Sequence, residues 1–347
     1  MQLISTHQVK PSNILAKNIY TNSGIVLLGK GAELTTMIVR RLEDLGIHLL
    51  YVENEMTNDI VVQDIISDET RRYALETVSQ VILKMSDKKN DRQISDLKLG
   101  KQFHDVVKTI VDDVRSQPRV LINLANIYAT DDYIYHHSVN VTVLSLAMGM
   151  GLGFNSKQLT ELGIGSILHD IGKTKTPSAI LHKPDKLTDE EWEIMKQHSA
   201  DGYEMLRQEP EISVTSAHIA YQHHERYNGS GYPRGLAGNE IHPYARIVAV
   251  ADTYDALVGN RTYRKAFLPH QAIELLLGSG NFLYDYEVIK VFVDRVALYP
   301  IGMTVTLDTG EKGIVIHNTP GRPQRPLLRM IENASGETID PYELDLQ

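Results

Sequence analysis

The sequence predicts a mainly α-helical protein, with a small α+β module before the helices and a β-rich appendage after them. Helical spacing of apolar residues dominates from Val120 to about Leu298. Near the N-terminus, two short apolar runs flank a single helical pattern, and after Tyr299 short alternating runs are separated by turn residues. With 347 residues and 42% hydrophobic content, the chain is long enough for two or three domains.

Residues 1–56 are expected to form the α+β module. The apolar runs Ile25–Leu28 and Leu49–Val52 have the length and composition of strands. A helix is predicted between Thr35, a favourable N-cap, and Gly46, a favourable terminator. Its apolar positions are Met37, Ile38, Val39, Leu42 and Leu45.

Residues 57–119 are expected to form a helical connector. Helical spacing runs from 64 to 85 and from 103 to 114, and the polar stretch at 86–93 is predicted to be a loop. A coiled dimerising segment is the alternative, but both stretches are too short for the sustained heptads that it needs.

Residues 120–298 are expected to form a helical domain, and residues 299–347 a β-rich tail. Within the helical domain, Val141, Leu144, Ala147 and Met148 share one face. Thr188 and Glu191 have the spacing of a capping box that opens the helix carrying His198. In the tail, strands are predicted at 303–307, 313–317 and 326–331, with turn residues between them.

Composition excludes several classes of function. The absence of cysteine rules out disulfides, thiolate zinc sites and cysteine nucleophiles, so any metal must be held by nitrogen and oxygen ligands. The net charge of −9 disfavours nonspecific binding to a nucleic acid polymer. No stretch reaches the roughly 20 apolar residues of a membrane span, and the N-terminus lacks a signal-peptide pattern, so the expected location is the cytoplasm.

Histidines and aspartates in the helical domain have the residue types of a two-metal centre. The tract LHDIGK places His169 and Asp170 at the end of an apolar helix, and Asp252 follows an almost wholly apolar run, where an unpaired carboxylate is costly to bury. Scattered over the same domain are further imidazoles. The candidate ligands are His137, His169, Asp170, His198, His223, His224 and Asp252.

Such a set could hold two divalent cations roughly 3.5 to 4 Å apart. Two-metal chemistry supplies a bridging hydroxide as nucleophile and neutralises phosphoryl oxygens, which predicts a phosphoesterase. The cations would also provide the local positive charge that an acidic chain needs to bind an anionic substrate. Zinc, iron and manganese all suit imidazole and carboxylate ligands.

The helical domain resembles the HD-GYP domains, a branch of the HD phosphohydrolases that degrade the bacterial second messenger cyclic di-GMP. The resemblance covers roughly residues 125–300. It rests on the motifs HHSVNV, LHDIGK, ILHKPDKLT, HHERYNGSGYP and RIVAVADTYDAL followed by RTYRKA. The flanks, with KPSNILAKNIY before the domain and YPIGMTVTL after it, are similar to segments that accompany this domain. The resemblance implies an HD-type helical bundle.

The resemblance also implies roles for individual residues. His137, His169, Asp170 and Asp252 would hold one metal, and His198, His223 and His224 the other, with Asp170 bridging; iron or manganese is expected. Asp170 and Lys173 would act in catalysis, with Lys173 on the scissile phosphate. Tyr232 would line the base or phosphate pocket, and Arg261 and Arg264 would grip the other phosphate or a guanine.

Two positions depart from the family pattern. Where some members have a glutamate that recruits a third metal, this chain has Tyr133, so two metals are expected. Where many members have Asp-Gly before Gly-Tyr-Pro, this chain has Asn228 and Gly229, which also suit a tight turn but could alter a contact with a partner protein.

The resulting hypothesis is hydrolysis of cyclic di-GMP to linear pGpG, with a second cut to GMP left open. One alternative is another cyclic dinucleotide such as 3′,3′-cyclic GMP-AMP, and another is a catalytically weak sensor of cyclic di-GMP. The N-terminal module could be a packing scaffold or a regulatory element. The sequence leaves the oligomeric state open, with a homodimer as the commonest symmetric assembly, and it leaves open a signalling protein partner.

Overall fold

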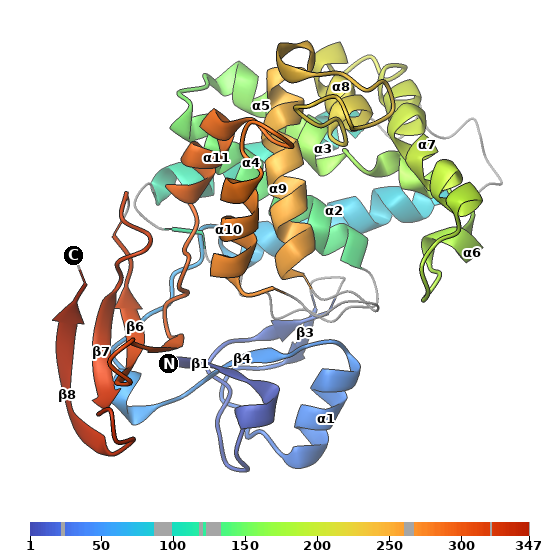
Figure 1. Ribbon diagram of the computed structural model, residues 1–347. Helices are drawn as coiled ribbons and strands as arrows, with labels where there is room; N and C mark the ends of the chain where they lie inside the picture. The colour runs from blue at the N-terminus through green and yellow to red at the C-terminus, as the bar shows by residue number, and fades with distance from the viewer. Residues whose placement is uncertain are drawn as a thin grey trace. The chain divides into compact units, whose positions relative to one another are not determined.

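The chain divides into two units, a helical one and a smaller one rich in β-structure (Figure 1). This computed structural model describes residues 1–21, 25–86, 99–117, 121–122, 133–259, 267–319 and 321–346. The helical unit comprises residues 66–118 and 134–292, and the second unit comprises residues 1–65, 119–133 and 293–347. The predicted fold class, mainly helical with a small α+β module and a β appendage, is confirmed. The four predicted segment boundaries stay a prediction.

Ten α-helices and two short 3-10 helices form the described part of the helical unit. They are α2 (Asp68–Ser86), α3 (Leu99–Ser116), α4 (Tyr133–Gly151), α5 (Ser156–Ile167), η4 (Ile171–Lys175), α6 (Ser178–Leu181), α7 (Asp189–Leu206), α8 (Val214–Gln222), η5 (Gly238–Glu240), α9 (Pro243–Val258), α10 (Pro269–Gly278) and α11 (Tyr286–Val293). Helices α2 and α3 overlap the two stretches predicted as connecting helices, and α3 begins four residues earlier and ends two residues later than predicted. The predicted loop at 86–93 falls, after its first residue, outside the described residues.

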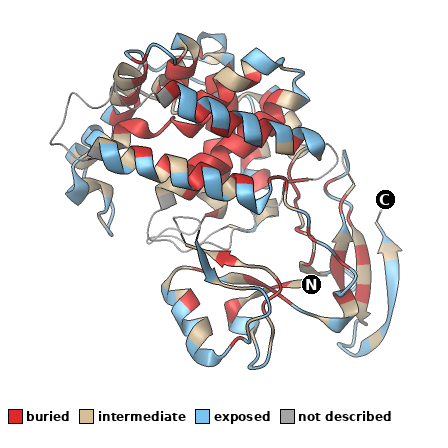
Figure 2. Ribbon diagram, turned by 180° about the vertical axis from the view of Figure 1, so that it is seen from behind, coloured by how far each residue is buried: buried red, intermediate tan, exposed pale blue. Residues whose placement is uncertain are grey.

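Helix α4 forms the centre of the helical unit. Every side chain from position 136 to position 149 is buried, because apolar and small residues occur on all sides of this helix. Figure 2 shows this buried interior, with partly exposed helices such as α7 around it. Helices α7 and α8 pack against each other, α8 packs on α5 and α9, and α7 contacts η4. Helix α4 itself carries one residue of the candidate site, His137, which contacts Asp252 and Asp255 of α9.

Helix α7 begins at the predicted capping box. The Thr188 hydroxyl accepts a hydrogen bond from the backbone N–H of Glu191 at 3.3 Å. The Glu191 carboxylate in turn accepts one from the backbone N–H of Thr188 at 2.8 Å. The cap fixes where the first turn of α7 begins. The side of the helix on which His198 lies follows from that starting point.

The N-terminal module has the predicted helix and both predicted strands. Its elements are β1 (Gln2–Ser5), η1 (Thr6–Gln8), β2 (Ile19–Tyr20), β3 (Val26–Leu28), α1 (Thr36–Asp44), β4 (Leu49–Val52) and η2 (Glu55–Thr57). Thr35 caps α1 by accepting from the Ile38 N–H at 3.2 Å, and Gly46 takes a φ of +74° just after the helix. Strand β1, which the sequence analysis did not predict, pairs antiparallel with β4.

The C-terminal tail forms an antiparallel sheet in the order β5-β6-β7-β8. The strands are β5 (Thr304–Thr306), β6 (Lys312–His317), β7 (Leu327–Glu332) and β8 (Thr338–Asp345). The first three lie in the predicted runs, and β8 completes a hairpin with β7.

The sheet and the N-terminal module belong to one unit. The Leu3 N–H donates to the Gly302 carbonyl at 2.8 Å, and Ile301 packs on the core of the module. The Arg329 guanidinium spans both Asp59 carboxylate oxygens at 2.6 and 2.8 Å. The two ends of the chain thus share one structural unit.

None of the helices in the described part of the chain combines the length and the apolar character needed to cross a membrane.

Candidate metal centre

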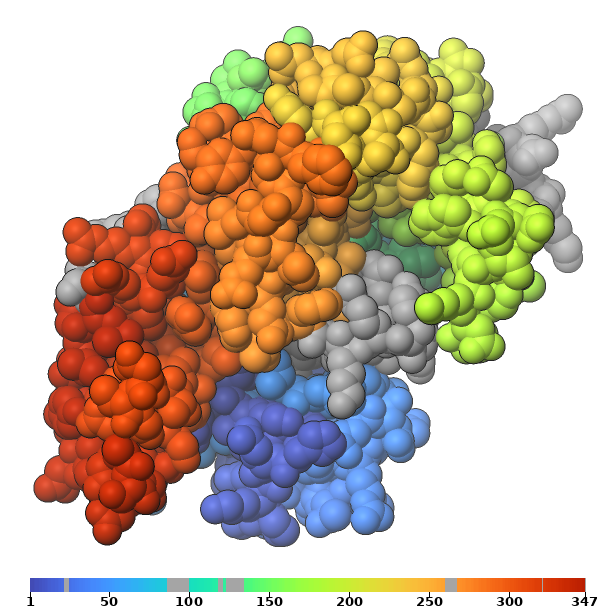
Figure 3. All heavy atoms as spheres, in the orientation of Figure 1, coloured from blue at the N-terminus to red at the C-terminus, as the bar shows by residue number. Residues whose placement is uncertain are grey.

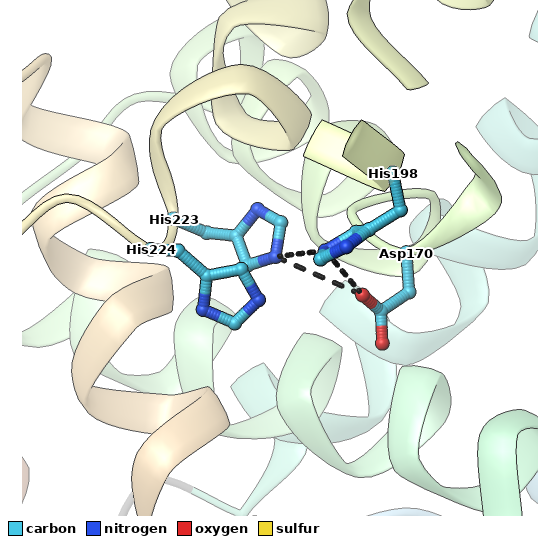
Figure 4. A group of neighbouring side chains, drawn as sticks. All are labelled: Asp170, His198, His223 and His224. Atoms are coloured by element: carbon cyan, nitrogen blue, oxygen red, sulfur yellow. Dashed lines mark hydrogen bonds and ion pairs between the residues drawn. The ribbon is translucent and has the colours of Figure 1, made fainter. Parts of the chain in front are cut away.

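Seven side chains of the helical unit meet at one buried centre. They fall into two groups, and within each group the potential ligand atoms all lie within 4.8 Å of one another. Figure 4 shows the first group, in which the Asp170 carboxylate is directed at the rings of His198 and His223. The first group consists of Asp170, His198, His223 and His224, and the second of His137, His169 and Asp252. The fold therefore brings together all seven residues that the sequence singled out.

The break between α5 and η4 places His169 and Asp170. Helix α5 ends at Ile167, and η4 begins at Ile171, so the His-Asp pair occupies a turn with both side chains buried. Directly after this turn, Gly172 packs so closely on α7 that a Cβ atom there would overlap the His198 carbonyl oxygen. The lack of a side chain at Gly172 allows Asp170 to reach the imidazole of His198, which lies 3.4 Å away.

Three imidazoles are oriented by backbone carbonyls. The Nδ1 atom of His169 lies 2.6 Å from the Ser166 oxygen, and that of His198 lies 2.6 Å from the Met195 oxygen. His223 Nδ1 lies 2.9 Å from the Ala220 oxygen. A carbonyl only accepts hydrogen bonds, so each Nδ1 carries the proton and each Nε2 offers its lone pair. These Nε2 atoms lie 3.4 to 3.7 Å from Asp170 oxygens.

His137 lies between two carboxylates of α9. Its Nδ1 is 2.7 Å from Asp255 Oδ2, and its Nε2 is 3.1 Å from Asp252 Oδ1. Asp252 also lies 3.9 Å from Nδ1 of His224. Asp252 therefore stands between His137 of the second group and His224 of the first, just as Asp170 lies near both groups.

The electrostatics favour ionised carboxylates and neutral imidazoles in the first group. Burial lowers the pKa of His198 to about 3 and holds the pKa of His224 well below its usual value. Burial opposes the charged form of Asp170, but the Lys173 charge and the neighbouring His169 outweigh it and hold the carboxyl pKa well below its usual range. Neutral imidazoles and carboxylates are the protonation states that metal ions bind.

His137 behaves differently from the other imidazoles. Burial opposes its protonation, but hydrogen bonds to Asp252 and Asp255 outweigh that effect and raise its pKa to about 9. The same contacts, against the opposing effect of burial, hold the pKa of Asp252 well below its usual range. In the metal-free protein a proton on His137 Nε2 therefore partly balances the carboxylates, in the place where a cation would do so.

Two buried atoms support the fit to a cation. His169 Nε2 and Asp170 Oδ1 have no hydrogen-bond partner among the described residues, although both are shielded from solvent. Unpaired polar atoms are costly in a protein interior. A cation at each group would satisfy them, and the nitrogen and oxygen donor set suits a divalent transition metal.

Lys173 and Tyr232 lie at the edge of this centre. The Lys173 ammonium donates to Asp170 Oδ2 at 2.5 Å. The Tyr232 ring stacks on His224 with centroids 4.7 Å apart, and the indole of Trp192, which is 46% exposed, meets Tyr232 edge-on at 6.0 Å. Figure 3 shows a hollow on one face of the molecule, beside the yellow-green residues of α6 and α7.

Glu225 holds the loop that carries Tyr232. Its buried carboxylate accepts hydrogen bonds from the backbone N–H groups of Arg234 at 2.8 Å and Leu236 at 2.9 Å. The preceding turn has the form expected of Asn-Gly: Asn228 Oδ1 accepts from the Ser230 N–H at 3.0 Å, and Gly229 takes a φ of +81°.

Some predicted residues fall outside this description. Arg261 and Arg264 lie in the segment 260–266, which is outside the described residues, and nothing is described of the side chain of Tyr133. His136 is buried but belongs to neither of the two groups found in the described part of the chain.

Asp255, Glu225 and Trp192 were not singled out from the sequence. A signal existed for Asp255, because it follows Asp252 by three residues on the same helix and so shares its face. Glu225 directly follows the His-His pair. An acidic residue at that position is equally consistent with a solvated surface group, so the sequence alone does not indicate a structural role. Trp192 is the single tryptophan of the chain.

Comparison with known proteins places the chain in a class. Residues 118–288 match the family described as HD domain, and residues 304–347 match the family described as KOW domain associated with HD domain. The helical fold and the paired His and Asp groups thus define an HD-domain protein with its associated C-terminal module. The chain belongs to the HD-GYP family.

Curated relatives include enzymes with different named substrates. A cyclic di-GMP phosphodiesterase of Pseudomonas aeruginosa is 34% identical over 240 residues, covering 69% of this chain and 58% of the relative. One of Thermotoga maritima is 40% identical over 50% of this chain and 47% of the relative. A 3′3′-cGAMP-specific phosphodiesterase of Vibrio cholerae is 31% identical, over 57% of this chain and 38% of the relative. The chain therefore spans about half the length of these relatives.

Among solved structures, an HDG"Y"P protein from Bdellovibrio bacteriovorus aligns with a TM-score of 0.47 and 21% identity, covering 84% of this chain and 97% of that one.

Proposed function

We propose that this protein is a metal-dependent phosphodiesterase that hydrolyses cyclic di-GMP to pGpG. The observation that carries the proposal is the pair of buried groups, between which Asp170 and Asp252 are placed to face cations on both sides. His137, His169, Asp170 and Asp252 would hold one cation, and His198, His223 and His224 the other, with Asp170 bridging. Iron or manganese is the metal that we propose.

When bound, such cations polarise a phosphoryl oxygen and lower the pKa of water to near neutrality. The protein's own contribution begins with orientation. Four imidazoles are fixed by contacts at Nδ1, so the site is preorganised and little rearrangement is needed on binding. Six of the seven side chains are buried and His224 is partly exposed, so the site excludes most bulk water, which strengthens each electrostatic contact.

We propose that Lys173 binds the scissile phosphate. Its ammonium lies at the Asp170 carboxylate and is 24% exposed, so a phosphate oxygen entering from the solvent side could share it. With a cation on Asp170, the lysine would be freed from neutralising that carboxylate. Its compact charge suits a phosphoryl oxygen.

Tyr232 and Trp192 offer aromatic faces to a purine. Burial raises the pKa of the Tyr232 phenol, so it remains a neutral hydrogen-bond donor. The exposed indole beside it adds a stacking surface, and nucleobases gain about 1–3 kcal/mol from such stacking. Arg261 and Arg264 stay proposed contacts to the second phosphate or a guanine. A homodimer and a signalling partner also stay proposals.

A second candidate substrate is 3′,3′-cyclic GMP-AMP, because relatives specific for it are 31% and 35% identical to this chain. The two dinucleotides share both phosphodiester bonds and differ in one base. Their discrimination would therefore depend on base contacts rather than on the metal ligands.

The test is chromatography of digests of both dinucleotides under reducing conditions, with metal content measured on the same protein. We expect wild-type protein to yield pGpG and Asp170→Ala to yield none. Asp105→Ala, which removes an exposed carboxylate on α3, serves as the matched control and should remain active. Normal hydrolysis by folded Asp170→Ala would refute the proposal. Binding without product by the metal-loaded wild type would instead indicate a sensor.

A further inference from the structure

A chain of polar contacts runs from the proposed metal ligand His137 to helix α2. His137 Nδ1 lies 2.7 Å from Asp255 Oδ2. The Asn140 side-chain amide donates to Asp255 Oδ1 at 2.9 Å, and Arg71 donates to Asn140 Oδ1 at 3.2 Å. His137, Asn140 and Asp255 are at most 3% exposed, so these contacts are made away from water.

Each contact determines the hydrogen-bonding role of the next. A guanidinium only donates, so Arg71 requires the oxygen of the Asn140 amide to face it. The NH₂ of that amide must then face Asp255. A carboxylate only accepts, so Asp255 requires a proton on Nδ1 of His137. In the neutral imidazole that would bind a cation, the Nε2 lone pair is then left for the side of His137 that faces Asp170 and Asp252.

Arg71 lies outside the segment that matches the HD domain. The match covers residues 118–288, whereas α2 spans Asp68–Ser86. Both segments nevertheless belong to the same structural unit. A helix preceding the matched domain thus contributes to the arrangement of a proposed ligand.

We propose that Arg71, Asn140 and Asp255 are positioning residues that fix the tautomer and the ring orientation of His137 for a cation in the second group. The proposal rests on the metal centre proposed above. Outer partners of this kind typically change metal affinity by about 10- to 100-fold. Helix α2 would therefore influence the metal centre without contacting the cation or the substrate.

An isosteric substitution tests the hydrogen-bond logic. In Asp255→Asn, the new amide must accept from Asn140 and so turns its NH₂ toward His137 Nδ1. That nitrogen then has to accept, which moves the imidazole proton to Nε2, where the cation should bind. We expect one of the two manganese equivalents to bind about 10- to 100-fold more weakly, with the first group unaffected.

The exchanged pair Asn140→Asp with Asp255→Asn should restore binding. Arg71 then donates to the carboxylate at position 140, the amide at 255 donates to that carboxylate, and its oxygen again accepts from His137 Nδ1. A residue that merely fills space would show no such recovery, because the two substitutions would then simply add. Arg71→Met should weaken the same manganese equivalent by less than Asp255→Asn.

The experiment is equilibrium Mn²⁺ binding to the full chain, measured by competition with a chromophoric chelator, alongside circular dichroism of each metal-free variant. A selective loss of Mn²⁺ affinity in Asp255→Asn, and its recovery in the exchanged pair, would support the positioning role of Arg71, Asn140 and Asp255. Unchanged Mn²⁺ affinity in folded Asp255→Asn, or no recovery in the folded exchanged pair, would overturn it. If Asp255→Asn does not fold, equal affinity of Arg71→Met and wild type overturns it.

The two proposals fail in different ways. Wild-type protein that binds two manganese ions but leaves cyclic di-GMP intact would refute the proposed function and would not affect the proposed positioning role of Arg71, Asn140 and Asp255. Wild-type protein that hydrolyses the dinucleotide while Asp255→Asn binds manganese normally would do the reverse. Wild-type protein that binds no manganese would overturn both.

Discussion

Replacing Gly172 with alanine should separate Asp170 from the imidazole of His198 on α7. A Cβ atom at this position would overlap the His198 carbonyl oxygen and come within 2.6 Å of the Gly202 backbone nitrogen, whereas ordinary contacts begin at 3.4 Å. The backbones of η4 and α7 would therefore have to separate by at least about 0.8 Å, the difference between those two distances, and by more to clear the His198 oxygen. Metal–ligand distances tolerate changes of only about 0.2 Å.

The displacement can be converted into expected effects. Overpacking of this kind costs about 1–3 kcal/mol, which in a unit of this size lowers the melting temperature by roughly 2–12 °C. Since the shift is about four times the coordination tolerance, we expect loss of the metal equivalent held by the first group, and with it of hydrolysis.

Two other glycines provide graded controls. A Cβ at Gly202 would lie 3.3 Å from both the Ala220 Cβ and the Gly172 nitrogen, which requires a shift of only a few tenths of an ångström, and one at Gly278 would meet open space. Metal content and thermal unfolding of the three alanine variants form the assay. A Gly172→Ala protein that retains both metal equivalents and has the same melting temperature as Gly278→Ala would refute the reasoning.

Three further predictions concern the exposed indole of Trp192, the Gly-Tyr-Pro loop and the smaller unit. Trp192→Ala should raise the KM for cyclic di-GMP by about 5- to 150-fold, from a lost stacking energy of about 1–3 kcal/mol, with little change in stability because the indole is 46% exposed; an unchanged KM would exclude stacking there. Glu225→Gln should destabilise the protein to urea by about 1–3 kcal/mol, since its amide can accept from only one of the two buried N–H groups, and equal stability would contradict this. Arg329 lowers the pKa of Asp59 from 3.8 to about 2, so this pair stabilises the fold above pH 3.8 and loses its effect as the pH falls toward 2. The melting-temperature difference between wild type and Asp59→Asn should shrink over that interval and be lost below pH 2, and a difference that persists well below pH 2 would indicate another cause.

Local signals in the sequence were sufficient for most individual elements. Thr188 and Glu191 are spaced as a reciprocal cap, and the structure has both hydrogen bonds of that cap. Thr35 and Gly46 likewise mark the ends of a helix through local backbone chemistry. Such features depend on residues three or four positions apart, so the sequence displays them directly.

Pairings between distant segments could not be predicted in this way. Strand β1 pairs with β4, in a register that joins Leu3 to Tyr51, 48 residues later, and Leu3 also forms a bridge with Met303. The composition of β1, QLIS, does not identify either partner, since many short apolar runs could pair with it equally well. The union of the two chain ends in one unit follows from this long-range packing, which residue patterns do not encode locally.

The candidate site illustrates the same division between local and distant information. Residue types and the cost of burying Asp252 among apolar neighbours pointed to the seven candidate ligands. The supporting residues were hidden because their roles depend on which atom of an imidazole faces which helix. Asp252 and Asp255 share one face of α9 through their spacing of three, and in the folded protein they contact opposite nitrogens of a single ring, Nε2 and Nδ1 of His137. One carboxylate can then face a cation while the other holds the ring in place, a distinction that appears only once α4 and α9 lie together.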